Sequence, residues 1–183
     1  DALQELTAIL DERYDLHCGL VDVGNWREAV LNSFGNLTGD YWFPSHGVSS
    51  KDGYVHPARD MVNRELPADG NRNWHWAWDR PSNLWVVNID PDTLKHRVHN
   101  GFVIRPLDDD GRLRSGAITL FGDTPHEHTE FASQVTAEEF VTRFEPRRSP
   151  KRAWEKIRKA NHFLDCCVGN MAARLILKHW GAE

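Results

Sequence analysis

The sequence predicts an α/β fold with a mixed or parallel sheet flanked by helices. Residues 16–21 form a short apolar run that ends at Asp22, residues 26–34 have helical spacing, and residues 41–43 form a second apolar run. A strand, a helix and a strand in this order are typical of parallel strands joined by a crossover helix. The chain has 183 residues, of which 40% are hydrophobic. That length can bury one sizeable core, so we expect a single domain over residues 1–183.

Local patterns define the other elements of the first half. Apolar residues at helical spacing predict an opening helix over residues 2–13. Asn25 and Gly35 are suited to begin and end the helix that follows the first strand. Residues 84–89 form the clearest strand of the chain, and Asp90, followed by a proline, favours a helix start directly after it.

Residues 44–83 interrupt this pattern. Gly, Pro, Asn and Asp are frequent there, so we expect a long loop or insertion. Within it Trp74, Trp76 and Trp78 alternate and would share one face of an extended segment. We favour a strand that packs on the core over a surface that stacks on nucleic-acid bases, because a duplex hides its bases.

The second half is predicted to be mainly helical. Residues 117–121 form one short strand. Thr136 and Glu139 have the spacing of a capping box, which predicts a helix over residues 136–144. An apolar stripe predicts a C-terminal helical segment over residues 149–181.

Composition limits the class of protein. No apolar stretch approaches the roughly 18 residues of a membrane span, and no leader pattern opens the chain, so we expect neither membrane insertion nor secretion. Three cysteines, two of them adjacent, fit a reducing compartment. The net charge is −5, yet residues 143–159 hold eight basic residues against two acidic ones, a local charge of +6. This segment is either a phosphate-binding surface or an ordinary solvated helix face.

Two far-separated acids could carry chemistry. Asp22 follows a strand, and open α/β sheets bind ligands outside the carboxyl ends of their strands. His162 and Asp165 are three positions apart on a predicted helix, so both could address one metal ion. Each acid also has a plainer interpretation: Asp22 as an Asx-turn or helix-capping residue, and Asp165 as a solvated residue at the helix rim. Taken together, the two favour a divalent-metal site.

The order of these segments resembles the nuclease domain of tailed-bacteriophage terminase large subunits, most closely the lambda-like branch. The resemblance extends over nearly the whole chain, with 48–83 and 105–125 poorly matched. The segments that carry it are Leu20-Val21-Asp22-Val23-Gly24, residues 26–34, Trp42 to Gly47, Leu84 to Lys95 with a helical lysine, Phe131 to Glu138, and Asn161-His162-Phe163-Leu164-Asp165-Cys166.

The resemblance implies an RNase H-like fold. In that family the first catalytic Asp lies on an opening strand that two further strands follow, and these would precede Asp1. We therefore expect the chain to be the carboxyl-terminal part of a terminase, or a nuclease domain without its opening strands. No ATPase Walker motif is present.

The resemblance also implies a mechanism. A metal-dependent endodeoxyribonuclease would use two Mg²⁺ or Mn²⁺ ions, with Asp22 and Asp165 as ligands. His162 would be a ligand or would position the attacking water, and Asp90 would be either a substitute ligand or a helix cap. Phosphate contacts are expected from Arg147, Arg148, Lys151, Arg152, Lys156, Arg158 and Lys159.

In this interpretation the protein acts in the host cytoplasm and cleaves concatemeric double-stranded viral DNA during packaging. Its partners would be DNA, the terminase small subunit and the portal or procapsid. A rival hypothesis is a non-catalytic module that docks on DNA or the portal. A third is a zinc hydrolase that uses His126-Glu127-His128, which lacks the His-Glu-x-x-His pattern. We expect Cys166 and Cys167 to be small buried apolar residues.

Overall fold

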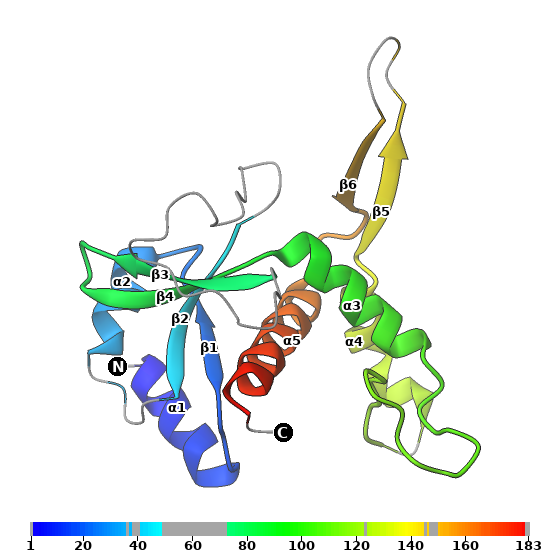
Figure 1. The fold of residues 1–183 in the computed structure, drawn as a ribbon, viewed down its shortest axis with the longest axis horizontal. Coiled ribbons are helices and arrows are strands. Elements are labelled where there is room, and N and C mark those ends of the chain that lie inside the picture. The colour runs from blue at the N-terminus through cyan, green and yellow to red at the C-terminus, as the bar shows by residue number, and fades with distance from the viewer. Residues whose placement is uncertain are drawn as a thin grey trace. The chain divides into compact units, whose positions relative to one another are not determined.

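The computed structural model (Figure 1) describes residues 2–35, 37, 41–48, 73–122, 124–144, 146 and 150–181. The chain divides into two compact units, one of Asp1–Pro91 with Ala172–Glu183 and one of Asp92–Met171. The expectation of a single domain over residues 1–183 stays a prediction.

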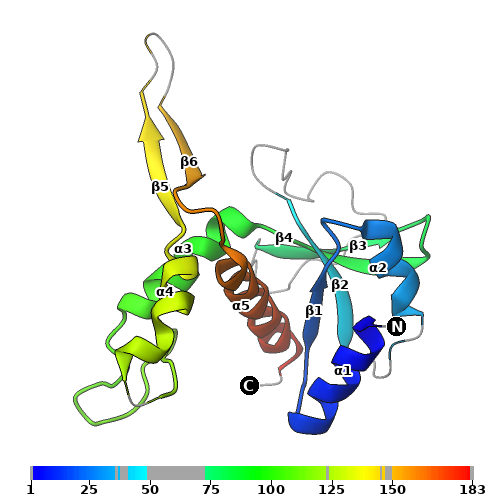
Figure 2. The ribbon, with the colours of Figure 1, turned by 180° about the vertical axis from the view of Figure 1, so that it is seen from behind.

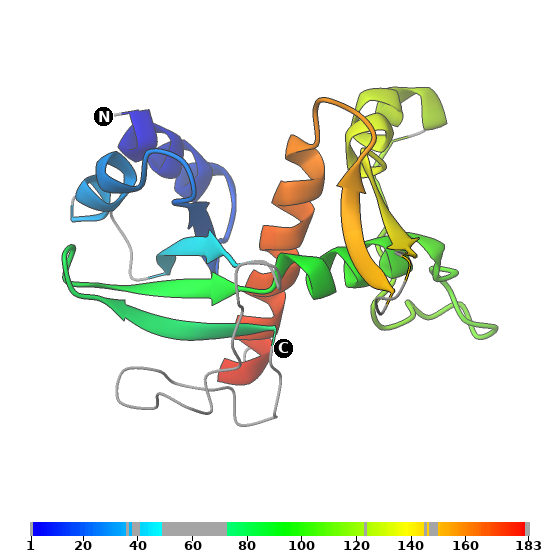
Figure 3. The same ribbon diagram turned by 90° about the horizontal axis from the view of Figure 1, so that it is seen from above.

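The first unit contains a four-stranded mixed sheet of strand order β1-β2-β4-β3. β1 pairs with β2 and β2 with β4 in parallel, whereas β3 pairs with β4 in the antiparallel sense. Figure 3 shows β3 and β4 side by side and running in opposite directions. The predicted α/β class with a mixed sheet is confirmed. The elements are α1 (Ala2–Arg13), β1 (Gly19–Asp22), α2 (Arg27–Phe34), β2 (Trp42–Gly47), β3 (Trp74–Asp79) and β4 (Leu84–Ile89).

Aliphatic side chains on one side of this sheet pack against α2. Val23, Leu31 and Val86 form the buried cluster, with Val30 and Leu84 packed against it. The crossover helix α2 between β1 and β2 therefore covers the sheet in the way that the β-α-β order predicts. Figure 2 shows α1 and α2 beside this part of the sheet.

The other side of the sheet is aromatic. Successive residues of a strand face opposite ways, so Trp74 and Trp76 of β3 share this side. Trp74 is 1% exposed. Trp76 stacks on Trp180 with 6.5 Å between ring centroids, and Phe43 meets both rings edge-on at 5.0 and 5.7 Å. The predicted tryptophan strand on the core is thus confirmed for Trp74 and Trp76. Trp78 instead lies 5.3 Å from Trp85, its direct partner on β4.

The second unit consists of helices and a two-stranded hairpin. Its elements are α3 (Pro91–Val103), the short 3-10 helix η4 (Pro125–His128), α4 (Thr129–Val135), β5 (Glu138–Arg143), β6 (Lys151–Lys156) and the start of α5 (His162–Trp180). Trp154 of β6 anchors the hairpin on α3, because its indole N–H donates to the carbonyl of Asp92 at 2.9 Å. Phe140 of β5 and His96 of α3 pack against the same indole, with ring centroids 5.5 and 4.8 Å away.

Two helix predictions are wrong in this unit. Residues 138–143 and 151–156 are paired strands, so the helix expected over 136–144 is absent and the C-terminal helix begins at His162. Thr136 does not begin a helix: it follows α4 as its C-cap, and its hydroxyl donates to the carbonyl of Ala132 at 2.7 Å. Cross-strand pairing of Phe140 with Trp154 outweighs the local helical spacing.

The interruption over residues 44–83 is narrower than expected. β2 extends into its first residues and β3 occupies 74–79, whereas residues 49–72 lie outside the described part of the chain. Residues 117–121 form no strand, and the amide of Ile118 donates to the carbonyl of Gly101. Trp26, not Asn25, is the N-cap of α2. None of the described helices is long and apolar enough to span a bilayer.

His99 on α3 is a half-buried titratable residue of the second unit. Its Nε2 is buried without a hydrogen-bond partner among the described residues, beside an apolar pocket of about 330 Å³ that Phe102 and Phe131 help to line. Desolvation lowers the pKa of His99 below its ordinary 6.5, and the charges of His96 and Lys95 lower it further. A bond with the Val135 backbone and the charge of Glu138 oppose this shift.

We predict that replacing His99 by leucine flattens the acid side of the stability profile. Because the folded state binds the proton more weakly than the unfolded state, the contribution of His99 is complete above pH 6.5 and is lost as the pH falls. Thermal unfolding from pH 7 to pH 5 should show a smaller fall in Tm for His99→Leu than for the wild type. The exposed His126→Gln variant should follow the wild type, and an unchanged slope in His99→Leu would contradict the assignment.

Candidate active site

Asp22 is the last residue of β1 and is exposed. Its Oδ1 accepts a hydrogen bond from the amide of Gly24 at 3.0 Å, which closes an Asx turn. A Cβ at Gly24 would lie 3.2 and 3.3 Å from the two Asp22 carboxylate oxygens, so the turn favours glycine at this position. The Asx-turn interpretation is therefore correct, and the turn also fixes the direction of the carboxylate at the carboxyl end of the strand.

A pocket of about 450 Å³ opens beside this turn in the first unit, with Gly24, Arg27, His46, Asp79 and Asn88 among its lining residues. It lies at the carboxyl ends of the parallel strands β1 and β2, where α/β sheets commonly bind ligands. The sequence predicted no role for Arg27, His46, Asp79 or Asn88, because these residues come from four different elements and meet only in the folded sheet.

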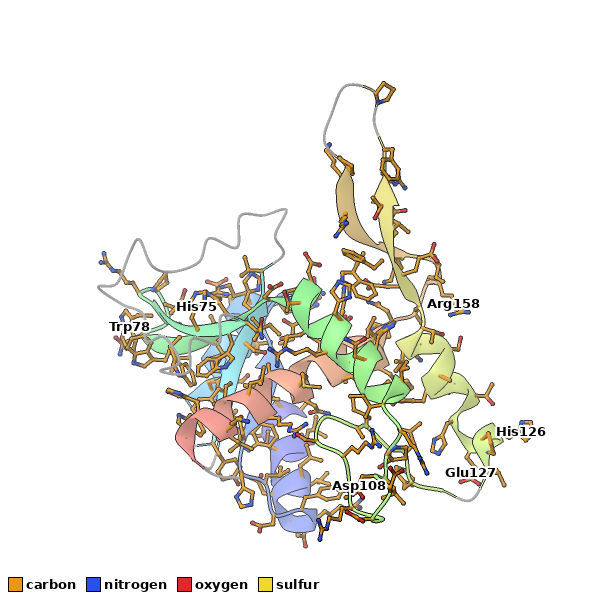
Figure 4. The ribbon with its side chains drawn as sticks, turned by 45° about the vertical axis from the view of Figure 1, so that its right-hand side comes forward. His75, Trp78, Asp108, His126, Glu127 and Arg158 are labelled. Carbon is orange, nitrogen blue, oxygen red and sulfur yellow. The ribbon has the colours of Figure 1, made fainter. Side chains whose placement is uncertain are left out.

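A row of polar side chains crosses the sheet at this pocket. His46, Asn88 and His75 are aligned on β2, β4 and β3, and the amide of Asn88 is 3.2 Å from Nε2 of His75. The Nδ1 atom of His46 is buried and has no hydrogen-bond partner among the described residues. Figure 4 shows His75 and Trp78 on β3.

Arg27 and Asp79 form an ion pair at the wall of the pocket, with Nη2 and Oδ1 2.9 Å apart. The Ser82 hydroxyl donates to Oδ2 of Asp79. Hydrogen bonds from Ser82 and then from Arg27 lower the pKa of Asp79. Asp79 therefore holds Arg27 in place, and the residue remains a carboxylate in neutral solution.

Asp165 lies in the first turn of α5, three residues after His162, and both side chains are exposed. The predicted helical segment over residues 149–181 would place Asp165 in mid-helix. The helix begins at His162, so Asp165 lies in its first turn instead. A carboxylate is favourable in a first turn, where it faces the positive end of the helix dipole. Oδ1 of Asp165 accepts a hydrogen bond from the side-chain amide of Asn161 at 3.3 Å.

Asn161 links Asp165 to a buried ion pair. Its side-chain amide also donates to Oε1 of Glu138 at 2.8 Å, and Oε2 of Glu138 accepts from Nζ of Lys95 at 2.7 Å. These residues come from α3, β5 and the start of α5. The sequence identified Lys95 as a helical lysine. Glu138 and Asn161 lay within segments that carry the family resemblance, but no role was predicted for either, although an Asn directly before an apolar helix was a visible signal.

The predicted phosphate-binding residues fall into three groups. Lys151, Arg152 and Lys156 are exposed on β6, and Lys159 is exposed in the turn before α5. Arg158 instead closes the end of α4, where its guanidinium donates to the Thr136 hydroxyl at 2.8 Å (Figure 4). Arg147 and Arg148 lie outside the described residues.

The other candidate chemistry has structural roles. Glu127 completes a capping box with Thr124, and His128 Nε2 bonds to the carbonyl of Phe121; Figure 4 shows Glu127 beside His126. Cys166 is exposed and Cys167 half-buried, so the expectation that both are buried is wrong. Desolvation raises the pKa of both thiols, and the charge of Asp165 raises that of Cys166 further.

The four proposed metal ligands are divided between the units. Asp22 and Asp90 belong to the first, and His162 and Asp165 to the second. The described residues contain no group of three or more His, Cys, Asp or Glu side chains placed to share a metal ion. Asp90 directly precedes α3, and its amide donates to the carbonyl of Asn73. Its role, and the convergence of Asp22 with Asp165, stay predictions.

The family model described as the endonuclease domain of the terminase large subunit gpA matches residues 2–180. No curated protein and no solved structure matches the chain.

The Asx turn predicts different effects for two substitutions of Asp22. The side-chain oxygen of Asn can still accept the Gly24 amide, so Asp22→Asn should leave the free energy of unfolding unchanged. Asp22→Ala removes the acceptor and should cost about 0.5–1.5 kcal/mol. Urea unfolding of both variants measures the difference, and equal losses would show that the turn does not depend on this bond.

Proposed function

This chain belongs to the family of terminase large-subunit gpA endonuclease domains, and we propose on that premise that it cleaves concatemeric double-stranded DNA during viral DNA packaging. The observation that carries the proposal is the match over residues 2–180, which includes both acids and the helix between the paired strands of the sheet. A nuclease role follows from the family. The metal dependence, the metal ligands and the DNA-contacting residues are our proposal.

Asp22 and Asp165 are proposed to hold Mg²⁺ or Mn²⁺, with His162 as a ligand or as the group that positions the attacking water. The donor chemistry fits, because hard divalent cations prefer carboxylate oxygens and both carboxylates are exposed. When bound, a pair of such ions supplies charge stabilisation for an in-line displacement at phosphorus. Asp90, which directly follows β4, is proposed either as a substitute ligand or as a cap of α3.

The protein's own contribution is orientation. The Gly24 amide fixes one oxygen of Asp22, and the Asn161 amide fixes one oxygen of Asp165. Carboxylates held in this way lose less freedom when a cation binds. His162, one turn before Asp165 on the same helix, is exposed and can accept a proton from water in its neutral form.

Duplex DNA is proposed to contact the β5–β6 hairpin. Lys151, Arg152 and Lys156 are exposed, and Lys159 extends the charge toward the start of α5. Lysine and arginine at this position would bind phosphates and carry no base information, which suits cleavage of many sequences. Arg147 and Arg148, which lie outside the described residues, are proposed as further phosphate contacts. The terminase small subunit and the portal are proposed as further partners.

Mutation of the acids tests the metal-dependent reaction. We expect plasmid nicking in Mg²⁺ or Mn²⁺ and complete loss of nicking in Asp165→Ala. The more conservative Asp22→Asn should also abolish nicking, because it keeps the turn but loses the charge. Asp109→Asn, which removes an acid that is 90% exposed, is the matched control and should nick at the wild-type rate. Full activity of Asp165→Ala would refute the site.

Salt dependence tests the hairpin surface. Each lost phosphate contact lowers the slope of log Kd against log salt by about 0.9, so Lys151→Gln with Arg152→Gln should lower it by about two. Arg105→Gln with Arg112→Gln removes the same charge from the 105–112 segment, where both arginines face aspartates, and should leave the slope unchanged. Equal slopes for the two double variants would rule out the hairpin as the contact surface.

A further inference from the structure

Glu138 is a buried carboxylate whose two oxygens are both occupied by protein donors. Its side chain is 9% exposed and that of Lys95 is 12% exposed. Oε2 accepts from Lys95 at 2.7 Å, and Oε1 accepts from Asn161 at 2.8 Å. A buried ion pair is frequently less stabilising than apolar residues of the same size, so folding stability alone does not account for this one.

Asn161 joins this ion pair to Asp165. Its amide nitrogen carries two hydrogens, and the nitrogen lies 2.8 Å from Oε1 of Glu138 and 3.3 Å from Oδ1 of Asp165. Both partners are carboxylates, which only accept, so the NH₂ group and not the amide oxygen must face them. Two ionised carboxylates repel each other, and a neutral group that donates a hydrogen bond to each of them offsets part of that repulsion.

The position of Asn161 makes this use of its side chain unusual. It directly precedes α5, where an Asn side chain ordinarily accepts a hydrogen bond from an amide in the first turn. Here the side-chain oxygen of Gln134, on α4, accepts a hydrogen bond from the backbone amide of Phe163 at 3.3 Å. An N-cap side chain would ordinarily accept from an amide at this position. Asn161 is 8% exposed, and its side-chain amide donates to the two acids instead.

We propose that Lys95, Glu138 and Asn161 are positioning residues that hold the Asp165 carboxylate in one orientation for a divalent cation. The proposal rests on the proposed function. Lys95 neutralises Glu138, Glu138 fixes the amide of Asn161, and Asn161 directs Oδ1 of Asp165. Groups that orient a metal ligand in this way commonly affect affinity by 10- to 100-fold.

Calorimetric titration of the full chain with Mn²⁺ tests this role without relying on activity. Asn161→Ala should weaken Mn²⁺ binding about tenfold or more. Gln134→Ala is the matched control, because it removes a bond to the same turn of α5 and leaves the carboxylate contact intact. It should lower the Tm and leave the Kd for Mn²⁺ unchanged. In an Asp165→Ala background, Asn161→Ala should have no further effect on the Kd.

A second variant separates positioning from stability. Lys95→Met combined with Glu138→Leu replaces the ion pair by apolar side chains, which should maintain or raise the Tm. The anchor of Asn161 is lost, so Mn²⁺ binding should still weaken about tenfold. This variant decides the question if Asn161→Ala does not fold.

The outcomes distinguish the two proposals. Weaker binding in both variants, with the control unchanged, supports the positioning role. If the wild type binds Mn²⁺ and both variants bind it equally well, the positioning role is overturned and the proposed function stands. If the wild type binds no Mn²⁺ at millimolar concentration, the metal-dependent function is overturned, and the positioning role with it.

Discussion

A buried carboxylate must be matched by donors, and Glu138 is the place where this requirement shapes the second unit. Its two oxygens bind Lys95 of α3 and Asn161 at the start of α5, so one side chain on β5 connects three elements. Trp154 adds an independent link between the hairpin and α3. With the hairpin and the helix start fixed in this way, the exposed Asp165 has a defined support beneath it.

The first unit reaches a comparable result by simpler means. β1 ends at Asp22, and the amide of Gly24, two residues later, donates to its carboxylate. A local turn therefore orients Asp22, whereas Lys95, Glu138 and Asn161 together orient Asp165. The aliphatic side of the sheet packs on α2, and its aromatic side contacts Trp180 at the end of α5. In each unit, a protein donor holds one oxygen of the acid that is proposed as a metal ligand. Such support is what a metal ligand requires if its oxygens are to keep one direction.

Sequence patterns predicted what depends on local spacing and failed where distant residues pair. The sequence predicted the β1-α2-β2 order, the strand at 84–89 and the two candidate acids, because each depends on a pattern of a few neighbouring residues. The hairpin was mistaken for helix, since Phe140 and Trp154 reveal their pairing only in three dimensions. The Lys95, Glu138 and Asn161 chain was missed for the same reason: 43 and 23 residues separate its partners.

The shared cation site is tested most directly by paramagnetic broadening of backbone amide signals on titration with Mn²⁺. If Asp22 and Asp165 bind the same ions, the amides of Val23 and Gly24 and those of Asp165 and Cys166 should lose intensity together, at the same metal concentration. Broadening confined to one of the two groups, or at unrelated concentrations, would contradict a common site for the two acids.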